Sequence, residues 1–185
     1  MVSHERRWWL ASLALIVLIY ATLYFVRGPV EFLRERNLLR LAVLAAFASA
    51  AVPVLWLLWR HRPGPREGVV IGIFAAVFFG LLTLTSRPEE KLHFLEYGLL
   101  AGMLHTACRL RAARLGGDRS GAELAVALQA AVLAALAGVG DELIQAVLPN
   151  RFFDVRDIVF NVVASLVVVA ALATAARVRP SASAA

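Results

Sequence analysis

The chain has 185 residues, of which 61% are hydrophobic and 17% are charged, and its formal net charge is +6. The mean hydropathy of +0.74 is typical of membrane proteins and excludes an ordinary soluble domain. The basic residues are spread over short loops without interleaved aromatic residues, so we exclude nucleic acid as a partner. We therefore expect an all-α, polytopic membrane helical bundle.

Six hydrophobic segments are long enough to cross a hydrocarbon layer about 30 Å thick as helices. In chain order they are Trp8–Val26, Leu38–Trp59, Val69–Thr85, Leu92–Leu110, Ala122–Leu148 and Ile158–Ala176. The first follows a basic N-terminus and lacks a cleavage site of small residues, so we interpret it as an uncleaved signal anchor. Cys108 is the only cysteine, lies in a predicted span, and is expected to be a small apolar core residue.

The distribution of basic residues predicts the orientation, because cytoplasmic loops carry an excess of lysine and arginine. With a cytoplasmic N-terminus, eleven of the 19 basic residues lie inside and eight outside. We therefore expect a multi-pass protein of the cytoplasmic (inner) membrane with both termini in the cytoplasm. The start of the fourth span, the end of the fifth and the start of the sixth would then meet at one side of the membrane, whichever way the chain is oriented.

Three groups of polar residues lie at these three span ends, and the members of each group are spaced to share one helical face. The groups are His93, Glu96 and Tyr97; Asp141 and Gln145, with Glu142 next to them; and Asp154, Asp157 and Asn161. An ionisable group in a membrane helix costs about 2.5–3.5 kcal/mol near the helix centre on insertion scales. A polar stripe that faced lipid would be costly, so we expect the three stripes to face each other.

Structural roles compete with functional ones for some of these residues. Asp154 and Asp157 resemble a capping box that opens the last helix, and capping and ligand binding both stay open for Asp154. Ser86 and Glu89 give a similar start signal for the fourth span. His93 lies beyond the first turn of its helix, where capping no longer helps.

Two adjacent carboxylates, Asp141 and Glu142, follow a long uncharged run and precede further apolar residues. At this depth they need a cation, a proton or a buried hydrogen-bond network. Arg151 is the candidate cation, because a guanidinium pairs with carboxylate or phosphate in bidentate fashion. The mixed nitrogen and oxygen ligands would suit several divalent ions, but no second histidine stripe is present. We therefore expect no metal and no other cofactor.

At these residues the chain resembles the VanZ-like family of small bacterial membrane proteins. Three segments carry the resemblance: Glu90-Lys91-Leu92-His93-Phe94-Leu95-Glu96-Tyr97; Asp141-Glu142-Leu143-Ile144-Gln145; and Pro149-Asn150-Arg151 followed by Asp154, Asp157 and Asn161. Asn150 stands where the family pattern has glycine, and Ala164 stands where a glycine follows the asparagine. The resemblance implies a division into N-terminal membrane-anchor spans (1–66), a four-helix membrane core (67–178) and a disordered tail (179–185).

The resemblance implies little about chemistry. The founding member of the family is associated with low-level resistance to the glycopeptide antibiotic teicoplanin, and its molecular mechanism is not established. Resistance by this chain does not follow from the resemblance. The expected partners are membrane lipids, including lipid-linked cell-wall precursors.

Two hypotheses from different classes follow. In the first, the polar residues form a pocket that engages an anionic envelope lipid or cell-wall precursor; its ligand-binding residues would be Lys91, Glu96, Tyr97, Gln145, Arg151, Asp154, Asp157 and Asn161. In the second, the chain is a membrane-embedded hydrolase or transferase that acts on such a lipid, and its catalytic residues would be His93, Asp141 and Glu142. A proton-coupled carrier is disfavoured, because the sequence has no evident inverted repeat.

Overall fold

The computed structural model describes residues 2–85, 87, 88, 90–116, 119–149 and 151–179, except for the side chains of residues 2 and 119–122. This part of the chain is helical, with short connections. Its helices are α1 (Val2–Phe25), α2 (Arg27–Glu35), α3 (Leu39–His61), α4 (Pro65–Leu82), α5 (Glu90–Arg114), α6 (Arg119–Val147) and α7 (Val155–Val178). Ser86, Glu89 and Asn150, which entered the sequence-based predictions, lie outside the described residues.

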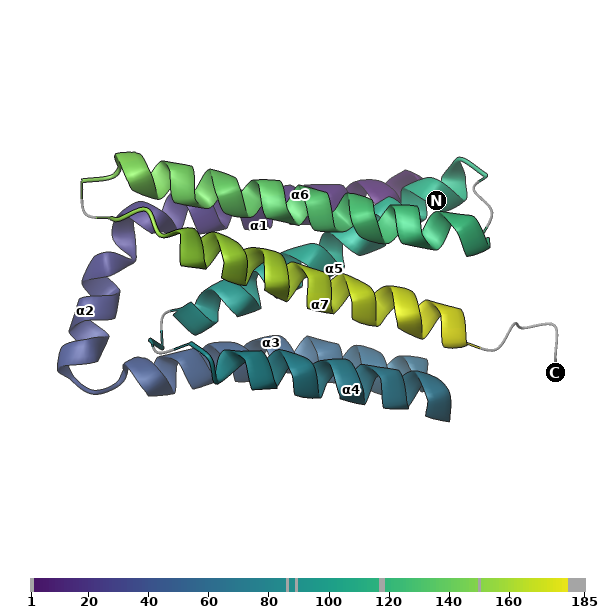
Figure 1. Cartoon of the computed structure of the whole chain (residues 1–185), viewed down its shortest axis with the longest axis horizontal. Coiled ribbons are helices and arrows are strands. Elements are labelled where there is room, and N and C mark those ends of the chain that lie inside the picture. Colours follow the sequence, from purple (N-terminus) through teal and green to yellow (C-terminus); the bar gives the residue numbers. More distant parts are fainter. Residues whose placement is uncertain (1, 86, 89, 117–118, 150, 180–185) are drawn as a thin grey trace.

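Six long helices run alongside one another, and the short helix α2 crosses one end of the bundle (Figure 1). We call this end the polar end, because α5 and α7 begin there and α6 ends there. The opposite end, where α1 begins and α7 ends, is the basic end (Figure 1). The three predicted polar stripes therefore lie at the same end of the bundle.

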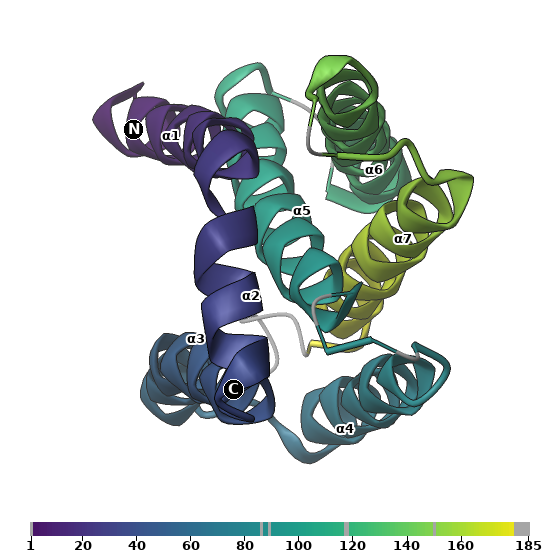
Figure 2. The same ribbon diagram turned by 90° about the vertical axis from the view of Figure 1, so that its left-hand side faces the viewer.

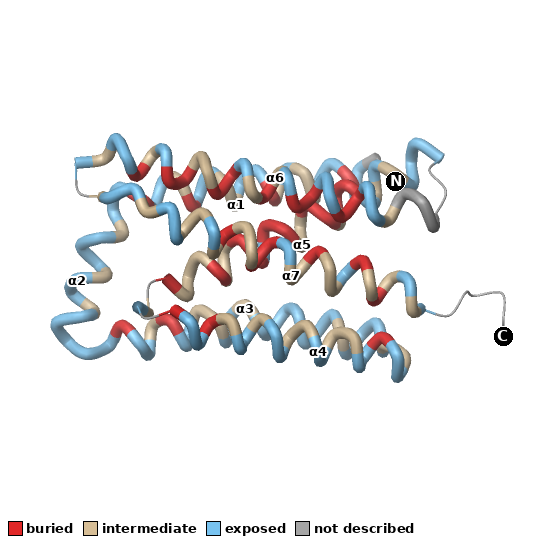
Figure 3. The backbone as a smooth tube through the Cα atoms, viewed as in Figure 1, coloured by how far each residue is buried: buried red, intermediate tan, exposed pale blue. Residues whose placement is uncertain are grey.

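Five helices, α1, α3, α4, α6 and α7, are long and apolar enough to cross a membrane in the described part of the chain. The fourth predicted span, Leu92–Leu110, corresponds to α5, which is 25 residues long but is not among these five. Its sequence carries charged residues at both ends and His93 and His105 between them. The difference has a physical reason, since α5 lies at the centre of the bundle and exposes little of its length to lipid (Figures 2 and 3).

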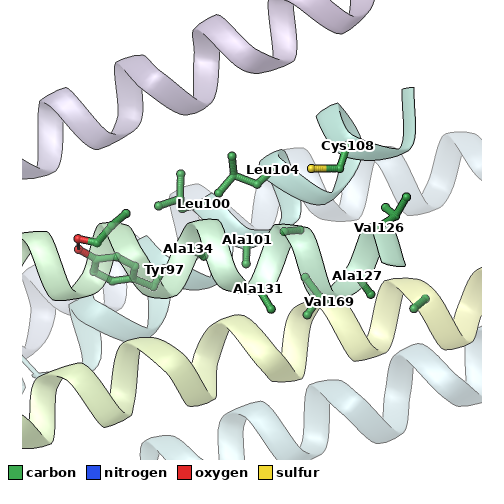
Figure 4. Packing of buried hydrophobic residues seen from close by; sticks show 13 residues of the cluster. Tyr97, Leu100, Ala101, Leu104, Cys108, Val126, Ala127, Ala131, Ala134 and Val169 are labelled. Carbon is green, nitrogen blue, oxygen red and sulfur yellow. Dashed lines mark hydrogen bonds between the residues drawn. The ribbon is translucent and has the colours of Figure 1, made fainter. Parts of the chain in front are cut away.

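Small residues allow the central helices to pack closely. The main apolar core lies between α5, α6 and α7 and includes Cys108, which is buried as expected (Figure 4). Ala130 and Ala134 on α6 have no exposed surface. On α5, a Cβ atom at Gly98 would lie 3.3 Å from the ring of Phe78, so this glycine leaves room for an aromatic side chain of α4.

The N-terminal helices differ in how firmly they pack. α1 packs against α5 and α6, whereas α3 contacts α5 and α2 and buries only Leu39 and Val43. α2 joins α1 to α3 across the polar end, as Figure 2 shows, and none of its residues is buried. Sequence analysis did not predict α2.

Ion pairs join separate helices at the basic end. Arg114 on α5 donates to both carboxylate oxygens of Glu5 on α1, at 2.6 and 3.1 Å. Arg179 donates to both carboxylate oxygens of Glu67 on α4, at 3.3 and 2.5 Å. Arg179 is the first residue of the predicted disordered tail 179–185, which stays a prediction because residues 180–185 lie outside the described part of the chain.

Candidate functional site

Asp141 is at the centre of the polar end and has no exposed surface. The hydroxyl of Tyr97, on α5, donates a hydrogen bond to Asp141 Oδ2 at 3.0 Å. The amide of Gln145, one turn later on α6, donates to Asp141 Oδ1 at 3.4 Å. Both carboxylate oxygens of Asp141 therefore accept a hydrogen bond from a neutral donor.

Glu142 is also fully buried and shares Gln145 with Asp141. Gln145 Nε2 donates to Glu142 Oε1 at 2.9 Å, and the backbone N–H of Asp154 donates to Glu142 Oε2 at 2.9 Å. The second contact ties the end of α6 to the start of α7. This pair of carboxylates is thus held by a network of neutral donors, one of the three possibilities that the sequence left open.

His93 lies between two carboxylates that come from different helices. Its Nδ1 is 3.7 Å from Oδ2 of the buried Asp141, and its Nε2 is 3.8 Å from Oδ2 of the partly exposed Asp157 on α7. The imidazole also stacks on the ring of Tyr97, with ring centroids 6.5 Å apart. The predicted meeting of the three polar stripes is therefore confirmed for His93, Asp141 and Asp157.

Asn161 lies about one turn after Asp157 on α7 and has no exposed surface. Neither its side-chain oxygen nor its side-chain nitrogen has a hydrogen-bond partner among the described residues. A Cβ atom at Gly138 on α6 would lie 2.9 Å from Asn161 Cβ, so only glycine allows this approach of the two helices. Buried amides are normally hydrogen-bonded, so the unpartnered amide of Asn161 is an exception to that rule.

Tyr20 on α1 is a member of the cluster that sequence analysis missed. Its hydroxyl donates to the backbone oxygen of Ala137 at 2.7 Å, and that oxygen also lies 3.4 Å from the hydroxyl of Tyr97. The tyrosine lies directly against Gly140, where a Cβ atom would collide with its hydroxyl oxygen. A lone phenol in an otherwise apolar span was the only sequence signal for this role.

Arg151 does not pair with the acids that the sequence suggested. Its Nε donates to the backbone oxygen of Leu23, near the end of α1, at 3.1 Å. The described residues place no carboxylate within ion-pair distance of this guanidinium. The α6–α7 connection thus turns back over α1, and the expected pairing of Arg151 with Asp141 and Glu142 is not formed.

The other predicted site residues differ in how they relate to the cluster. Asp154 caps α7, since its Oδ1 accepts a hydrogen bond from the backbone N–H of Arg156 at 2.8 Å. Glu96 is half-buried, and the described residues give it no hydrogen bond or ion pair. Lys91 lies on the face of α5 that carries Gly98, toward α4 and α7, because positions seven apart nearly coincide on a helix. Among the described residues, Lys91 is not one of the partners of Asp141.

A model of the VanZ/LLP1 family matches residues 10–176. The chain belongs to the VanZ/LLP1 family. The matched range begins in α1, so it includes the two N-terminal spans that the motif resemblance left aside. No curated protein and no solved structure matches the chain.

The motifs that carry the VanZ/LLP1 resemblance lie in direct contact in this fold. His93 and Tyr97 of the first segment meet Asp141 of the second, and Glu142 of the second binds the backbone of Asp154 in the third. Among the described residues, no group of three or more histidine, cysteine or acidic side chains is arranged to hold a metal ion. The arrangement offers hydrogen-bond donors, a guanidinium and titratable groups within one region of a multi-pass membrane protein.

Proposed function

We propose that this VanZ/LLP1 protein binds the phosphate of an anionic envelope lipid, such as a lipid-linked cell-wall precursor, at the polar end of its bundle. The observation that carries the proposal is the guanidinium of Arg151, which is held in place by Leu23 and has no carboxylate partner among the described residues. Its Nη groups remain for a phosphate, which guanidinium binds in bidentate fashion.

The neighbouring buried groups support the same proposal. Asn161 keeps both a donor and an acceptor without partners, and Asp141 and Glu142 already have neutral donors. Both carboxylates therefore have hydrogen-bond donors other than Arg151. Polar groups of a lipid headgroup, such as sugar or glycerol hydroxyls, would complete the bonding of Asn161, while Glu96 and Tyr97 would line the approach from α5.

The proposal includes an orientation in which the polar end faces outward from the bacterial cytoplasmic membrane. The N-terminal end of α1 and the C-terminal end of α7 both lie at the basic end, which supports an even number of membrane crossings (Figure 1). In a Cys108→Ala background, a cysteine at Leu115 should resist an impermeant thiol reagent in intact cells. Labelling of Leu115→Cys without permeabilisation would refute the cytoplasmic placement.

The Arg151→Ala variant tests the ligand-binding role. It removes one hydrogen bond to a backbone carbonyl, so the free energy of unfolding should fall by only about 1 kcal/mol. Lipid mass spectrometry of the purified protein should show loss of one co-purifying anionic lipid. Arg156→Ala is the matched control, because Arg156 is exposed, lies at the start of α7 and stacks over Phe160.

A different outcome would identify Arg151 as a counter-ion only. Loss of one partner of a buried ion pair typically costs about 3–5 kcal/mol. Arg151→Ala would then lower the free energy of unfolding by this larger amount. If the addition of Asp141→Asn and Glu142→Gln restores both stability and lipid retention, the phosphate-binding role is excluded.

The position of His93 favours a second candidate function, a membrane-embedded acid–base enzyme that acts on such a lipid. Both ring nitrogens face carboxylates, Asp141 on the buried side and Asp157 on the partly exposed side. An imidazole in this position can accept a proton at one nitrogen while it releases one at the other. His93, Asp141 and Glu142 would then be the catalytic groups.

Product analysis separates the two functions. Membranes that contain the wild-type protein are compared with membranes that contain Glu142→Gln or His93→Gln, and the lipids are profiled by mass spectrometry. A lipid product that is present with wild type and absent with both variants supports the enzyme. Identical lipid profiles, together with lipid retention that depends on Arg151, support binding alone.

A further inference from the structure

The basic end contains a cavity of about 330 Å³ between the start of α1 and the end of α5. Its lining residues are Glu5, Arg6, Trp9, Leu10 and Arg114. The start of α1 and the end of α5 lie at the opposite end of the bundle from the end of α6 and the start of α7, so the cavity is separate from the polar end (Figure 1). No residue of this cavity takes part in the proposed function.

The charges around this cavity favour an anion. Glu5 is already neutralised, because Arg114 holds both of its oxygens through Nε and Nη2. Arg6 is exposed, and the described contacts give it neither a hydrogen bond nor an ion pair. Arg111 lies nearly one turn before Arg114 on α5 and adds further positive charge. The cavity thus combines one paired and one unpaired guanidinium at its rim.

An apolar track continues from Arg6 along α1. Leu10, Leu13 and Val17 are each more than half exposed, at 53%, 56% and 57%. Their spacing from Arg6 places all four residues within about 60° on the helix. Since six long helices form a membrane bundle here, this track faces lipid chains while Arg6 stands at the level of the headgroups.

We propose that the cavity is a binding site for an anionic phospholipid of the leaflet at the basic end. Arg6 and the free Nη of Arg114 hold the phosphate, and an acyl chain follows Leu10, Leu13 and Val17. Trp9 lines the same cavity, which suits an indole at the membrane–water interface. Basic pockets between membrane helices are suited to anionic headgroups, and the excess positive charge disfavours a zwitterionic lipid.

Fluorescence of Trp9 tests this site in the full-length protein. With Trp8, Trp56 and Trp59 changed to phenylalanine, Trp9 is the only tryptophan. The protein is reconstituted in phosphatidylcholine vesicles that contain increasing fractions of brominated phosphatidylglycerol or brominated phosphatidylcholine. Brominated phosphatidylglycerol should quench Trp9 at lower mole fractions, and Arg6→Gln should weaken that preference about fivefold, as expected for one basic residue at an anionic surface.

Arg7→Gln is the matched control, because it removes the same charge from the next position of α1 but Arg7 does not line the cavity. It should leave the preference unchanged, as should Arg151→Ala at the polar end, and Arg6→Lys should retain most of it. Equal quenching by the two brominated lipids overturns the proposal. An equal loss in Arg6→Gln and Arg7→Gln also overturns it, because general surface charge would then explain the preference.

Discussion

The buried acidic residues at the two ends of the bundle have different partners. At the basic end, Glu5 and Glu67 are each held by an arginine from another helix, and Glu123 lies 3.2 Å from His105. At the polar end, Asp141 and Glu142 are more deeply buried, yet the described residues give neither of them an arginine or lysine partner. Their hydrogen-bond donors are a phenol, an amide and a backbone N–H.

This difference separates acids that join helices through arginine from acids that join helices through neutral donors. The paired acids at the basic end each connect two helices, and a guanidinium occupies both of their oxygens. Burial of a carboxylate without a cation is costly, so the polar end retains an arrangement that stability alone would not favour. The contrast is consistent with placing function at the polar end.

The largest effect is expected where the polar end depends on close helix approach. Gly138→Val introduces a side chain at the position where even a Cβ atom lies 2.9 Å from Asn161. Overpacking of this kind costs about 1–3 kcal/mol or more, and we expect the upper end of that range in the free energy of unfolding in detergent. Gly72→Val on α4 is the control, because its side chain would enter open space and should cost far less. Equal losses would show that the close approach of α6 and α7 does not limit the side chain at residue 138.

A smaller effect is expected for the neutral donor of Asp141. Tyr97→Phe removes the hydroxyl that donates to this carboxylate and leaves a fully buried oxygen with one donor fewer. The loss should be about 1–3 kcal/mol in thermal unfolding. Tyr24→Phe, at a residue that is 61% exposed, is the control and should be neutral. If Tyr97→Phe is also neutral, Asp141 does not depend on this hydroxyl as a hydrogen-bond donor.

The smallest effect is expected at the basic end. Arg179 is half exposed, and pairs of this type contribute about 0–1 kcal/mol. Arg179→Ala should therefore lower the stability less than Tyr97→Phe, and the addition of Glu67→Gln should recover most of the loss. A larger loss in Arg179→Ala than in Tyr97→Phe would break the distinction between the two ends.

Much of the fold could be predicted because the length of an apolar run is a local property. Each of the six predicted spans corresponds to one long helix, although α5 is less apolar than a typical span. The helix α2 was missed because nine residues that begin Arg27-Gly28-Pro29 resemble a turn, and an amphipathic pattern over so short a length is weak. The division at residue 66 stays a prediction.

The site was predictable to the extent that it depends on spacing within a helix. The shared faces of His93 with Tyr97 and of Asp141 with Gln145 follow from helical geometry, and the contacts between them confirm it. The partner of Arg151 could not be predicted, because it is a backbone carbonyl on a distant helix. The need for glycine at residue 138 could not be predicted either, because it depends on how closely α7 approaches α6.

The low hydropathy of α5 has a consequence for biosynthesis. During translation α5 emerges after α1 but before α6 and α7, which later surround its polar residues. A helix that carries several ionisable groups does not enter lipid readily by itself. Of the helices that precede α5 in the chain, α1 packs against it most extensively, through contacts that include Arg114 and Glu5. A nascent chain that ends after α5 should therefore integrate poorly, and the insertion machinery must retain this helix until α6 and α7 arrive.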